Sequence, residues 1–364
     1  MSMSGRTSAG LAAMAALALI LTGTSRAPVS AAGNGSTVTV KLSDGPNNLI
    51  PRLADSLGYL KEEGIELKDV KVEDFAKEDY LQAEVMHQGH IDATVHWFHH
   101  VLFGAGNNAP VQAVMLIQDT PGMTIMVANR VKDQIKSAAD FKGRKVAEGA
   151  AFSTKSYLTH YMTVKAGLPP HSYTPVAVAS EGRKEAVLKG LNEGAVDVMA
   201  FMEPMTSSIL ATKMATPLYD LTTAEGTRKA LGDVWPAQCL FLTPDYIKAH
   251  PDTTQHLVNA FVKTMRFVNT HTAEQIADKL PASYFAGKNR EAEVERLRKL
   301  MPTFAKGDYS LPPTAVKLVA DAVFSSTFDN SDEGKYRAHA RDAKVSLDHF
   351  YDNRFVEKAM KEIK

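Results

Sequence analysis

The chain has 364 residues, of which 45% are hydrophobic and 23% are charged, and its formal net charge is zero. This composition predicts a globular protein with one large or two medium domains. A chain without excess positive charge has no field that attracts nucleic acid or anionic lipid, so we expect neither as a partner. The single cysteine, Cys239, cannot form an internal disulfide, and its apolar neighbours predict a buried, unreactive thiol.

The first 32 residues have the pattern of a secretory signal peptide. Arg6 precedes an apolar core at residues 11–21, and small residues provide a cleavage site near Ala31 or Ala32. The core is shorter than the ~20 apolar residues that cross a bilayer, and no cysteine near this site could accept a lipid. We therefore predict an exported protein that is cleaved from its signal and carries no lipid anchor.

Strands and helices alternate along the next part of the chain. Residues 37–42 alternate in hydrophobicity and predict a strand, which a turn at 43–48 separates from a helix at 49–60. The pattern then predicts a strand at 70–72, a helix at 77–87, and strands at 90–95, 111–117 and 124–128.

The following segment, residues 137–205, repeats this order of elements. The pattern predicts a strand at 145–147, a helix from Ser153 or Thr154 to Gly167, a helix at 183–191 and a strand at 195–201. Further apolar strands are predicted at 218–221 and 239–242.

A short motif marks the repeat. Gly-x-Ile-Asp at residues 89–92 returns as Gly-x-Val-Asp at 194–197, each time between a helix and a strand. A spacing of this size is too long for a solenoid and predicts two lobes of like topology. Two strands that cross between the lobes imply a cleft with hinges, which we expect near 122–127 and 236–242.

The C-terminal part is predicted to be helical, with no recognisable site. Its expected helices lie at residues 256–268, 292–300, 312–324 and 345–350. The Lys-rich end of the chain is expected to form a solvated wrap around the first lobe.

Three elements resemble the periplasmic substrate-binding proteins of ABC importers, in the sulfonate, nitrate, taurine and pyrimidine-precursor branch. They are Asp140-Phe-Lys-Gly-Arg-Lys-Val146, the helix start at Ser153-Thr154, and Gly194-Ala-Val-Asp197 leading to Glu203-Pro204. The resemblance implies a periplasmic location and an α/β, two-lobed type II fold. It also implies a small-molecule ligand, a permease and an ATPase as partners, no cofactor, no catalytic role, and a monomer.

The expected lobe boundaries follow from the same order of elements. After the signal peptide at 1–32, we expect the first part of lobe I at 33–122 and lobe II at 123–237. Residues 238–364 would complete lobe I and add the C-terminal helices.

If the lobes are equivalent, four loops line the cleft, at residues 43–48, 96–99, 148–157 and 202–206. Asp44 and Glu203 fall on opposing loops and could accept hydrogen bonds from an amine or amidine, although Asp44 also suits an Asx-turn. Asn47 lies in the first of these loops.

The helix start in the third loop offers hydroxyls and free backbone N–H groups to a small anion. Ser153, Thr154 and Tyr157 are the candidates there, and an ordinary N-cap is the alternative role for Ser153 and Thr154. Because the four loops contain no arginine, a zwitterion or a neutral polar ligand fits better than a multiply charged anion.

His96 and Trp97 directly follow a predicted strand and are candidates for lining the pocket. Trp97 could stack on a planar ligand or pack in the core. The bulky run at 96–98 departs from the small turn usual in the family and suggests an aromatic or larger ligand.

Two alternative functions stay open at this point. His96 and His100 have the i, i+4 spacing of zinc ligands within a cluster of histidines, which suggests a periplasmic metal-binding protein. An enzyme on the same scaffold, of the pyrimidine-precursor type, is the other. Its relatives work in the cytoplasm and use a cysteine-rich motif that this chain lacks.

Overall fold

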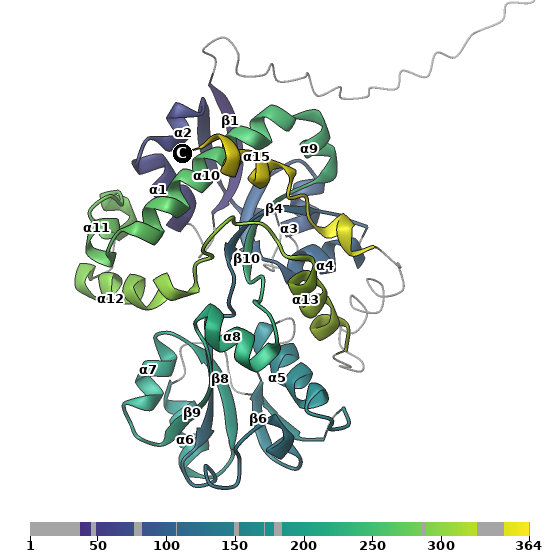
Figure 1. Cartoon of the computed structure of the whole chain (residues 1–364). Coiled ribbons are helices and arrows are strands. Elements are labelled where there is room, and N and C mark those ends of the chain that lie inside the picture. The colour runs from purple at the N-terminus through teal and green to yellow at the C-terminus, as the bar shows by residue number, and fades with distance from the viewer. Residues whose placement is uncertain are drawn as a thin grey trace, which may run out of the picture.

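The computed structural model describes residues 37–44, 49–75, 82–106, 108–148, 153–170, 172–177, 184–285, 289–325 and 346–363. Within these residues, the strands form two five-stranded sheets, each flanked by helices (Figure 1). The predicted α/β fold of two lobes is therefore confirmed. The segments that carry the expected signal peptide and residues 45–48 lie outside the described residues.

The first sheet has the strand order β2-β1-β3-β10-β4. Its strands are β1 (Val38–Asp44), β2 (Ile65–Lys71), β3 (Ala93–Trp97), β4 (Gln112–Gln118) and β10 (Gln238–Leu242). β1 runs parallel to β2 and β3, whereas β10 runs antiparallel to β3 and β4.

The second sheet repeats this topology with the order β7-β6-β8-β5-β9. Its strands are β5 (Met123–Ala128), β6 (Lys145–Glu148), β7 (Thr174–Ala177), β8 (Val198–Met202) and β9 (Ala215–Leu221). β5 is the antiparallel strand here and occupies the place that β10 has in the first sheet. Each sheet thus receives the strand that follows a crossing from the other.

Helices cover both sheets. Around the first sheet lie α1 (Leu49–Ser56), α2 (Tyr59–Glu62), α3 (Gln82–His87), α4 (His99–Gly106), α9 (Pro244–Ala249) and α10 (Pro251–Thr270). With the second sheet are α5 (Thr154–Lys165), α6 (Lys184–Asn192), α7 (Met205–Leu210) and α8 (Ala224–Leu231). The C-terminal part adds α11 (Ala273–Ala277), α12 (Arg290–Leu300), α13 (Pro313–Ser325) and α15 (Arg354–Glu362).

Several elements differ from the sequence-based expectation. The helix expected at 49–60 is broken at Gly58, whose φ of 80° is left-handed, into α1 and α2. The strand expected at 70–72 is the end of the longer β2. The helix expected at 345–350 is a 3₁₀ turn at Leu347–Phe350. The chain end is an amphipathic helix, α15, that buries Phe355 and Val356 and packs on α10, so it is more than a solvated wrap.

The Gly-x-[Ile/Val]-Asp motif has the same structural role in both sheets. The backbone N–H of Lys41 donates to Asp92 Oδ2 at 2.9 Å, and that of Lys145 donates to Asp197 Oδ2 at 2.8 Å. The N–H of each aspartate returns a bond to the carbonyl of the same lysine, at 2.8 and 2.7 Å. Each aspartate therefore ties the start of its strand to the neighbouring strand.

The lysine and glycine of the motif complete this clamp. Lys41 Nζ donates to the carbonyl of Gly89, and Lys145 Nζ donates to that of Gly194 at 2.9 Å. Both glycines have a positive φ, 76° and 70°, which a side chain would strain. The repeated motif is thus a structural feature of the two lobes.

We expect Asp197→Ala to lower the free energy of unfolding by about 3 kcal/mol. The change leaves a buried strand N–H without its acceptor and removes the partner of Arg130, whose guanidinium donates to Asp197 Oδ1 at 2.5 Å. Asp197→Asn keeps one acceptor and should cost less. Urea denaturation measures both. Asp133→Ala, at an exposed residue, is the control, and an equal loss in that variant would contradict the clamp.

The chain passes between the sheets at residues 119–122 and 232–237. Backbone hydrogen bonds join these crossings to each other: the N–H of Trp235 donates to the carbonyl of Asp119 at 2.8 Å, and that of Ala237 donates to Gln118 at 2.9 Å. The hinges expected at 122–127 and 236–242 were placed too far along the chain, because most of those residues are buried strand in β5 and β10.

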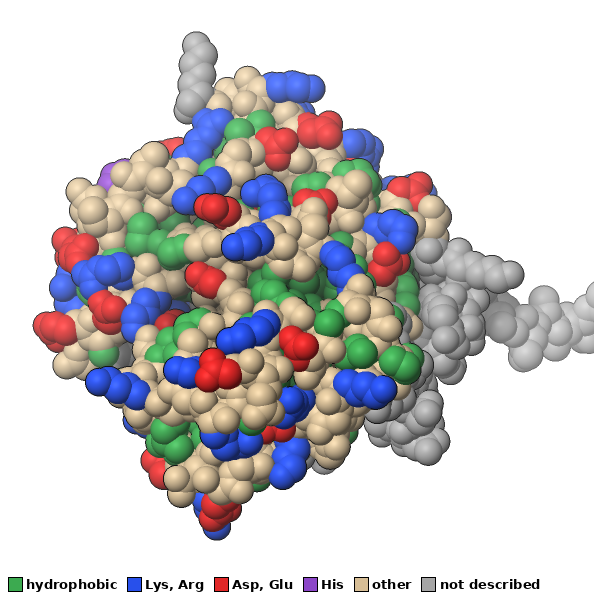
Figure 2. Space-filling model, turned by 60° about the horizontal axis from the view of Figure 1, so that its bottom comes forward, with side chains coloured by type: hydrophobic (Ala, Val, Ile, Leu, Met, Phe, Trp, Pro, Cys, Tyr) green, Lys and Arg blue, Asp and Glu red, His purple; other side chains and the backbone are tan. Residues whose placement is uncertain are grey.

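The C-terminal helices also connect the lobes. α13 packs against both α4 and α5, beside the crossings in Figure 1. None of the helices within the described ranges is long and apolar enough to span a membrane. Figure 2 shows acidic and basic side chains interspersed over the lower face, in keeping with the zero net charge.

Candidate functional site

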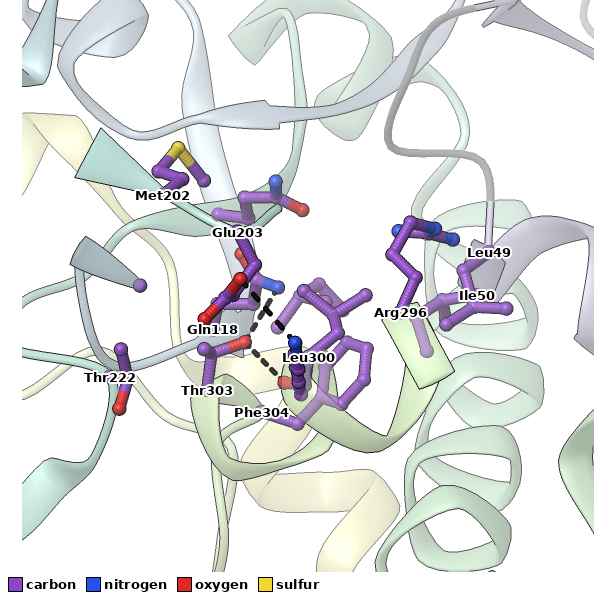
Figure 3. A pocket seen from close by; sticks show the side chains of 14 residues that line it. Leu49, Ile50, Gln118, Met202, Glu203, Thr222, Arg296, Leu300, Thr303 and Phe304 are labelled. Carbon is purple, nitrogen blue, oxygen red and sulfur yellow. Dashed lines mark hydrogen bonds and ion pairs between the residues drawn. The ribbon is translucent and has the colours of Figure 1, made fainter. Parts of the chain in front are cut away.

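A cavity of about 140 Å³ lies between the two sheets. Gln118 and Gln238 line it from the first sheet, and Met202 and Glu203 line it from the end of β8 in the second. Its apolar wall comes from Leu49, Ile50, Ile117, Leu300 and Phe304 (Figure 3). A guest in this cavity would therefore touch both lobes.

Helix α12 and the turn after it supply a third side of the cavity, with Arg296, Lys299 and Thr303. The sequence-based expectation that the C-terminal part carries no site is therefore wrong for these residues. The four loops expected to line the cleft contain no arginine, but α12 brings two basic side chains to it. Residues 303–305 anchor α12 to β4, because Ala305 N–H donates to the Ile117 carbonyl at 2.9 Å.

Glu203 faces the cavity and is linked to α12. Its Oε1 accepts from the hydroxyl of Ser207 at 2.8 Å, and its Oε2 lies 3.7 Å from Lys299 Nζ. Lys299 Nζ also donates to Ser207 Oγ at 2.8 Å. These contacts run from the C-terminal helix to the β8–α7 turn of the second lobe, so they bridge the lobes.

Other polar groups of the lining already have partners. Gln118 Nε2 donates to Thr303 Oγ1 at 2.9 Å, as the dashed line in Figure 3 shows. The hydroxyl of Thr222 donates to Asp220 at 2.6 Å. Arg296 is held by Glu293 and by the hydroxyl of Tyr284, with Nε 2.9 Å from Glu293 Oε1. The pairing of Glu203 with Lys299 is looser than these contacts.

A second cluster, of buried aromatic and imidazole rings, connects the lobes on the α4 side. His96, at the end of β3, meets His100 edge-on with ring centroids 4.4 Å apart. His99 lies 5.3 Å from Tyr157 of α5. Tyr157 stacks on Trp235 of the second crossing at 6.3 Å with an interplanar angle of 14°. The rings thus link β3, α4, α5 and a crossing segment.

Four buried polar atoms in this region have no hydrogen-bond partner. They are His96 Nδ1, His100 Nδ1, Asp119 Oδ1 and Ser153 Oγ. Buried polar atoms without partners cost stability and are rare in native proteins. Atoms of this kind on both sides of the lobe boundary are what a site for a polar guest requires.

Burial sets the charge of these groups. It lowers the pKa of His96 from its usual 6.5 to about 4, and it lowers the pKa of His100 well below its usual value. Both imidazoles are therefore neutral at pH 7 and can only offer hydrogen bonds to a ligand. Burial raises the pKa of Asp119 to about 6, against the opposing charges of Arg228 and Lys306.

The predicted site residues fall at the ends of the strands and at the start of α5. Asp44 ends β1, and its side chain and Asn47 lie outside the described residues. His96 is buried, whereas Trp97 is half-buried and packs against the core. Glu203 lines the cavity with α12 and does not contact the imidazole cluster through any of the bonds described above.

The start of α5 holds the remaining predicted residues. Ser153 is the N-cap, but its side chain makes no capping bond. The hydroxyls of Thr154 and Tyr157 are bonded to each other at 2.9 Å. The ordinary N-cap role for the Ser153 hydroxyl is thus not what the structure has, and this hydroxyl is available to a ligand.

The alternatives raised by the sequence meet specific observations. Among the described residues, no three or more His, Cys, Asp and Glu side chains gather in a way that could hold a metal ion. Cys239 is fully buried, its Sγ lies 4.0 Å from the carbonyl of His96, and burial raises the pKa of its thiol well above the usual value. A thiol of this kind is unsuited to act as a nucleophile.

Two sheets of the same strand order around an enclosed cavity define the two-lobed fold of periplasmic binding proteins. Residues 47–275 match the sequence model of the NMT1/THI5-like family. The chain belongs to this family. No curated protein matches the sequence.

Solved structures with 13–17% identity share the fold. The alkanesulfonate-binding protein SsuA from Xanthomonas axonopodis pv. citri, bound to MOPS, is 17% identical with a TM-score of 0.56, over 85% of this chain and 98% of that one. The periplasmic nitrate-binding protein NrtA from Synechocystis PCC 6803 is 13% identical with a TM-score of 0.60, over 90% and 89%. The enzyme DszB, in complex with biphenyl-2-sulfinic acid, is 17% identical with a TM-score of 0.56, over 89% and 99%.

Proposed function

We propose that this protein is an extracytoplasmic solute-binding protein. In this proposal it captures a small polar organic molecule between its lobes in the periplasm and delivers it to an ABC permease with its ATPase. The observation that carries the proposal is the cavity between the sheets, which is lined by Gln118 and Gln238 on one side and Glu203 on the other. A ligand that touches both lobes favours the closed form by its differential affinity.

The proposed ligand contacts come from both lobes. His96 and Trp97 would serve from the first, together with Asp44 and Asn47 of the β1–α1 loop. From the second lobe, Ser153, Thr154, Tyr157 and Glu203 would take part. The unpartnered atoms His96 Nδ1 and Ser153 Oγ support this assignment.

The candidate ligands are organic sulfonates, taurine, nitrate and aminopyrimidines. Neutral imidazoles and hydroxyls suit hydrogen bonding to a polar group better than capture of a multiply charged anion. The lobes would be residues 33–122 with 238–364, and residues 123–237. The allocation of β1–β4 and β10 to one sheet supports that division.

We propose no enzymatic role. DszB shows that an enzyme can have this fold, and fold alone does not fix function. The buried, protonated thiol of Cys239 argues against thiol chemistry here.

Thermal unfolding of the mature chain, from residue 33, tests the proposal with a panel of sulfonates, nitrate, amines and aminopyrimidines. A ligand at one hundred times its dissociation constant should stabilise the protein by about 2.7 kcal/mol. Ligand recovered after denaturation should be chemically unchanged. Conversion of the ligand would favour an enzyme, and the lack of any stabilising compound would contradict solute binding.

A further inference from the structure

We infer that Glu203 and Lys299 form an exchangeable ion pair that selects ligands carrying one positive and one negative group. In this inference the cationic end of the ligand binds Glu203 and the anionic end binds Lys299. Lys299, from C-terminal helix α12, would therefore be a specificity-determining residue. The inference rests on the proposed solute-binding function.

The two residues come from parts of the molecule that the ligand must bridge. Glu203 follows β8 in the second sheet. Lys299 lies near the end of α12, which is anchored to β4 of the first sheet through the Thr303–Gln118 hydrogen bond at 2.9 Å. Both side chains line the same cavity. A ligand held by the pair would thus contact both lobes.

The pair is loose enough to exchange partners. Nζ and Oε2 lie 3.7 Å apart, beyond the usual length of a charged hydrogen bond. Lys299 spends one of its three donors on Ser207 Oγ at 2.8 Å, so donors remain. The Glu203 carboxylate accepts from the Ser207 hydroxyl and, at 3.3 Å, from its backbone N–H, so acceptor sites remain as well.

Charge balance in the closed cavity then selects the ligand. Glu203 and Lys299 are 24% and 33% exposed, and a bound ligand would remove part of that contact with water. A purely anionic ligand would turn Lys299 away from Glu203 and leave a carboxylate without its counter-ion. A cation would do the reverse. A short zwitterion gives each residue a new partner and leaves neither charge unpaired.

The other basic residue of the lining cannot take this role as readily. Arg296 is already held by Glu293 and by the hydroxyl of Tyr284 at 2.8 Å. An anion that recruited Arg296 would have to break that arrangement. Lys299 is therefore the basic side chain with donors to spare among those that line the cavity in the described residues.

Calorimetric titration of the mature chain tests the inference with four probes. They are 2-aminoethanesulfonate, 3-aminopropanoate, ethanesulfonate and ethylammonium, so that the anionic group and the charge pattern vary separately. We expect at least one zwitterion to bind about tenfold or more tightly than either singly charged probe. A preference for the sulfonate or for the carboxylate zwitterion identifies which anionic group the site takes.

Variants then assign the ends. Glu203→Gln should weaken zwitterion binding about tenfold or more without weakening ethanesulfonate, and Lys299→Gln should weaken it without weakening ethylammonium. Glu295→Gln is the matched control, because Glu295 lies 3.7 Å from Lys299 Nζ but does not line the cavity, and it should leave affinity unchanged.

Three results would overturn the inference while leaving solute binding intact. These are equal affinity for a singly charged probe and its zwitterion, zwitterion binding that is indifferent to both variants, and a stabilising solute in the wider panel with no zwitterion bound. If no compound of any class binds, the proposed function itself fails.

Discussion

Acidification from pH 6.5 to pH 4 should lower the free energy of unfolding, and His96→Phe should remove a large part of that loss. Burial lowers the pKa of His96 from 6.5 to about 4 in the folded protein, while the unfolded chain binds the proton near 6.5. Below pH 6.5 the unfolded state therefore binds more protons, and stability falls until the folded pKa is passed. The contribution of His96 is on the order of 3 kcal/mol. His100 acts in the same direction.

Asp119 opposes this effect and has to be separated from it. Burial raises the pKa of its carboxyl from 3.8 to about 6, so between these values the folded state binds more protons than the unfolded state. Stability gained from Asp119 therefore appears as the pH falls through the same window. Removing it by Asp119→Asn should make the acid loss of the protein steeper.

Urea denaturation of the wild type, His96→Phe and Asp119→Asn at several pH values between 7 and 4 measures both contributions. At pH 7 the His96→Phe protein should also be somewhat more stable, because the variant removes a buried nitrogen without a partner. Its ligand binding should be lost if His96 contacts the ligand as proposed. Parallel pH profiles for the wild type and His96→Phe would contradict the assigned cause.

The repeat in the sequence was sufficient to predict the two-lobed topology. The motif at residues 89–92 and 194–197 marks the same structural place in each sheet, and apolar runs long enough to form buried strands lie at equivalent positions. The crossing strands β5 and β10 were predicted because both are continuous apolar runs, buried throughout. Local pattern and global fold agree at these places.

Elements stabilised mainly by their surroundings were not predictable. β7 (Thr174–Ala177) contains Pro175 and lies at the edge of its sheet, where it pairs with β6 alone. A proline in a four-residue stretch argues against a strand unless its position at an edge is known. Short helices such as α7 and α9 likewise depend on packing, because so few residues carry little periodic signal.

The candidate site was predictable only in its loops. His96, Ser153 and Glu203 follow or precede recognisable elements, so their positions at the lobe boundary could be expected. The place of α12 could not, because a charged amphipathic helix has the same pattern whether its polar side faces water or a cavity. The signal available was the Asn289 N-cap followed by a run rich in charge, and it locates the helix but not Lys299.

Trp235→Ala should have the largest effect of a single substitution described here. The side chain is 2% exposed, in the second crossing, and its ring stacks on Tyr157 of α5. Truncation would leave a cavity between the crossing and the second lobe and should cost about 3–5 kcal/mol. Trp235→Phe keeps most of the stacking and should lose less than half of this.

Unfolding followed by circular dichroism checks this prediction. Trp235 and Trp97 are the two tryptophans of the chain, so fluorescence would lose half of its reporters in the variant. Trp97→Ala is the matched control, because Trp97 is only half-buried and packs at the edge of the core. A loss in Trp235→Ala no greater than that in Trp97→Ala would mean that the ring does not hold the crossing against α5. The buried ring cluster would then not couple the lobes.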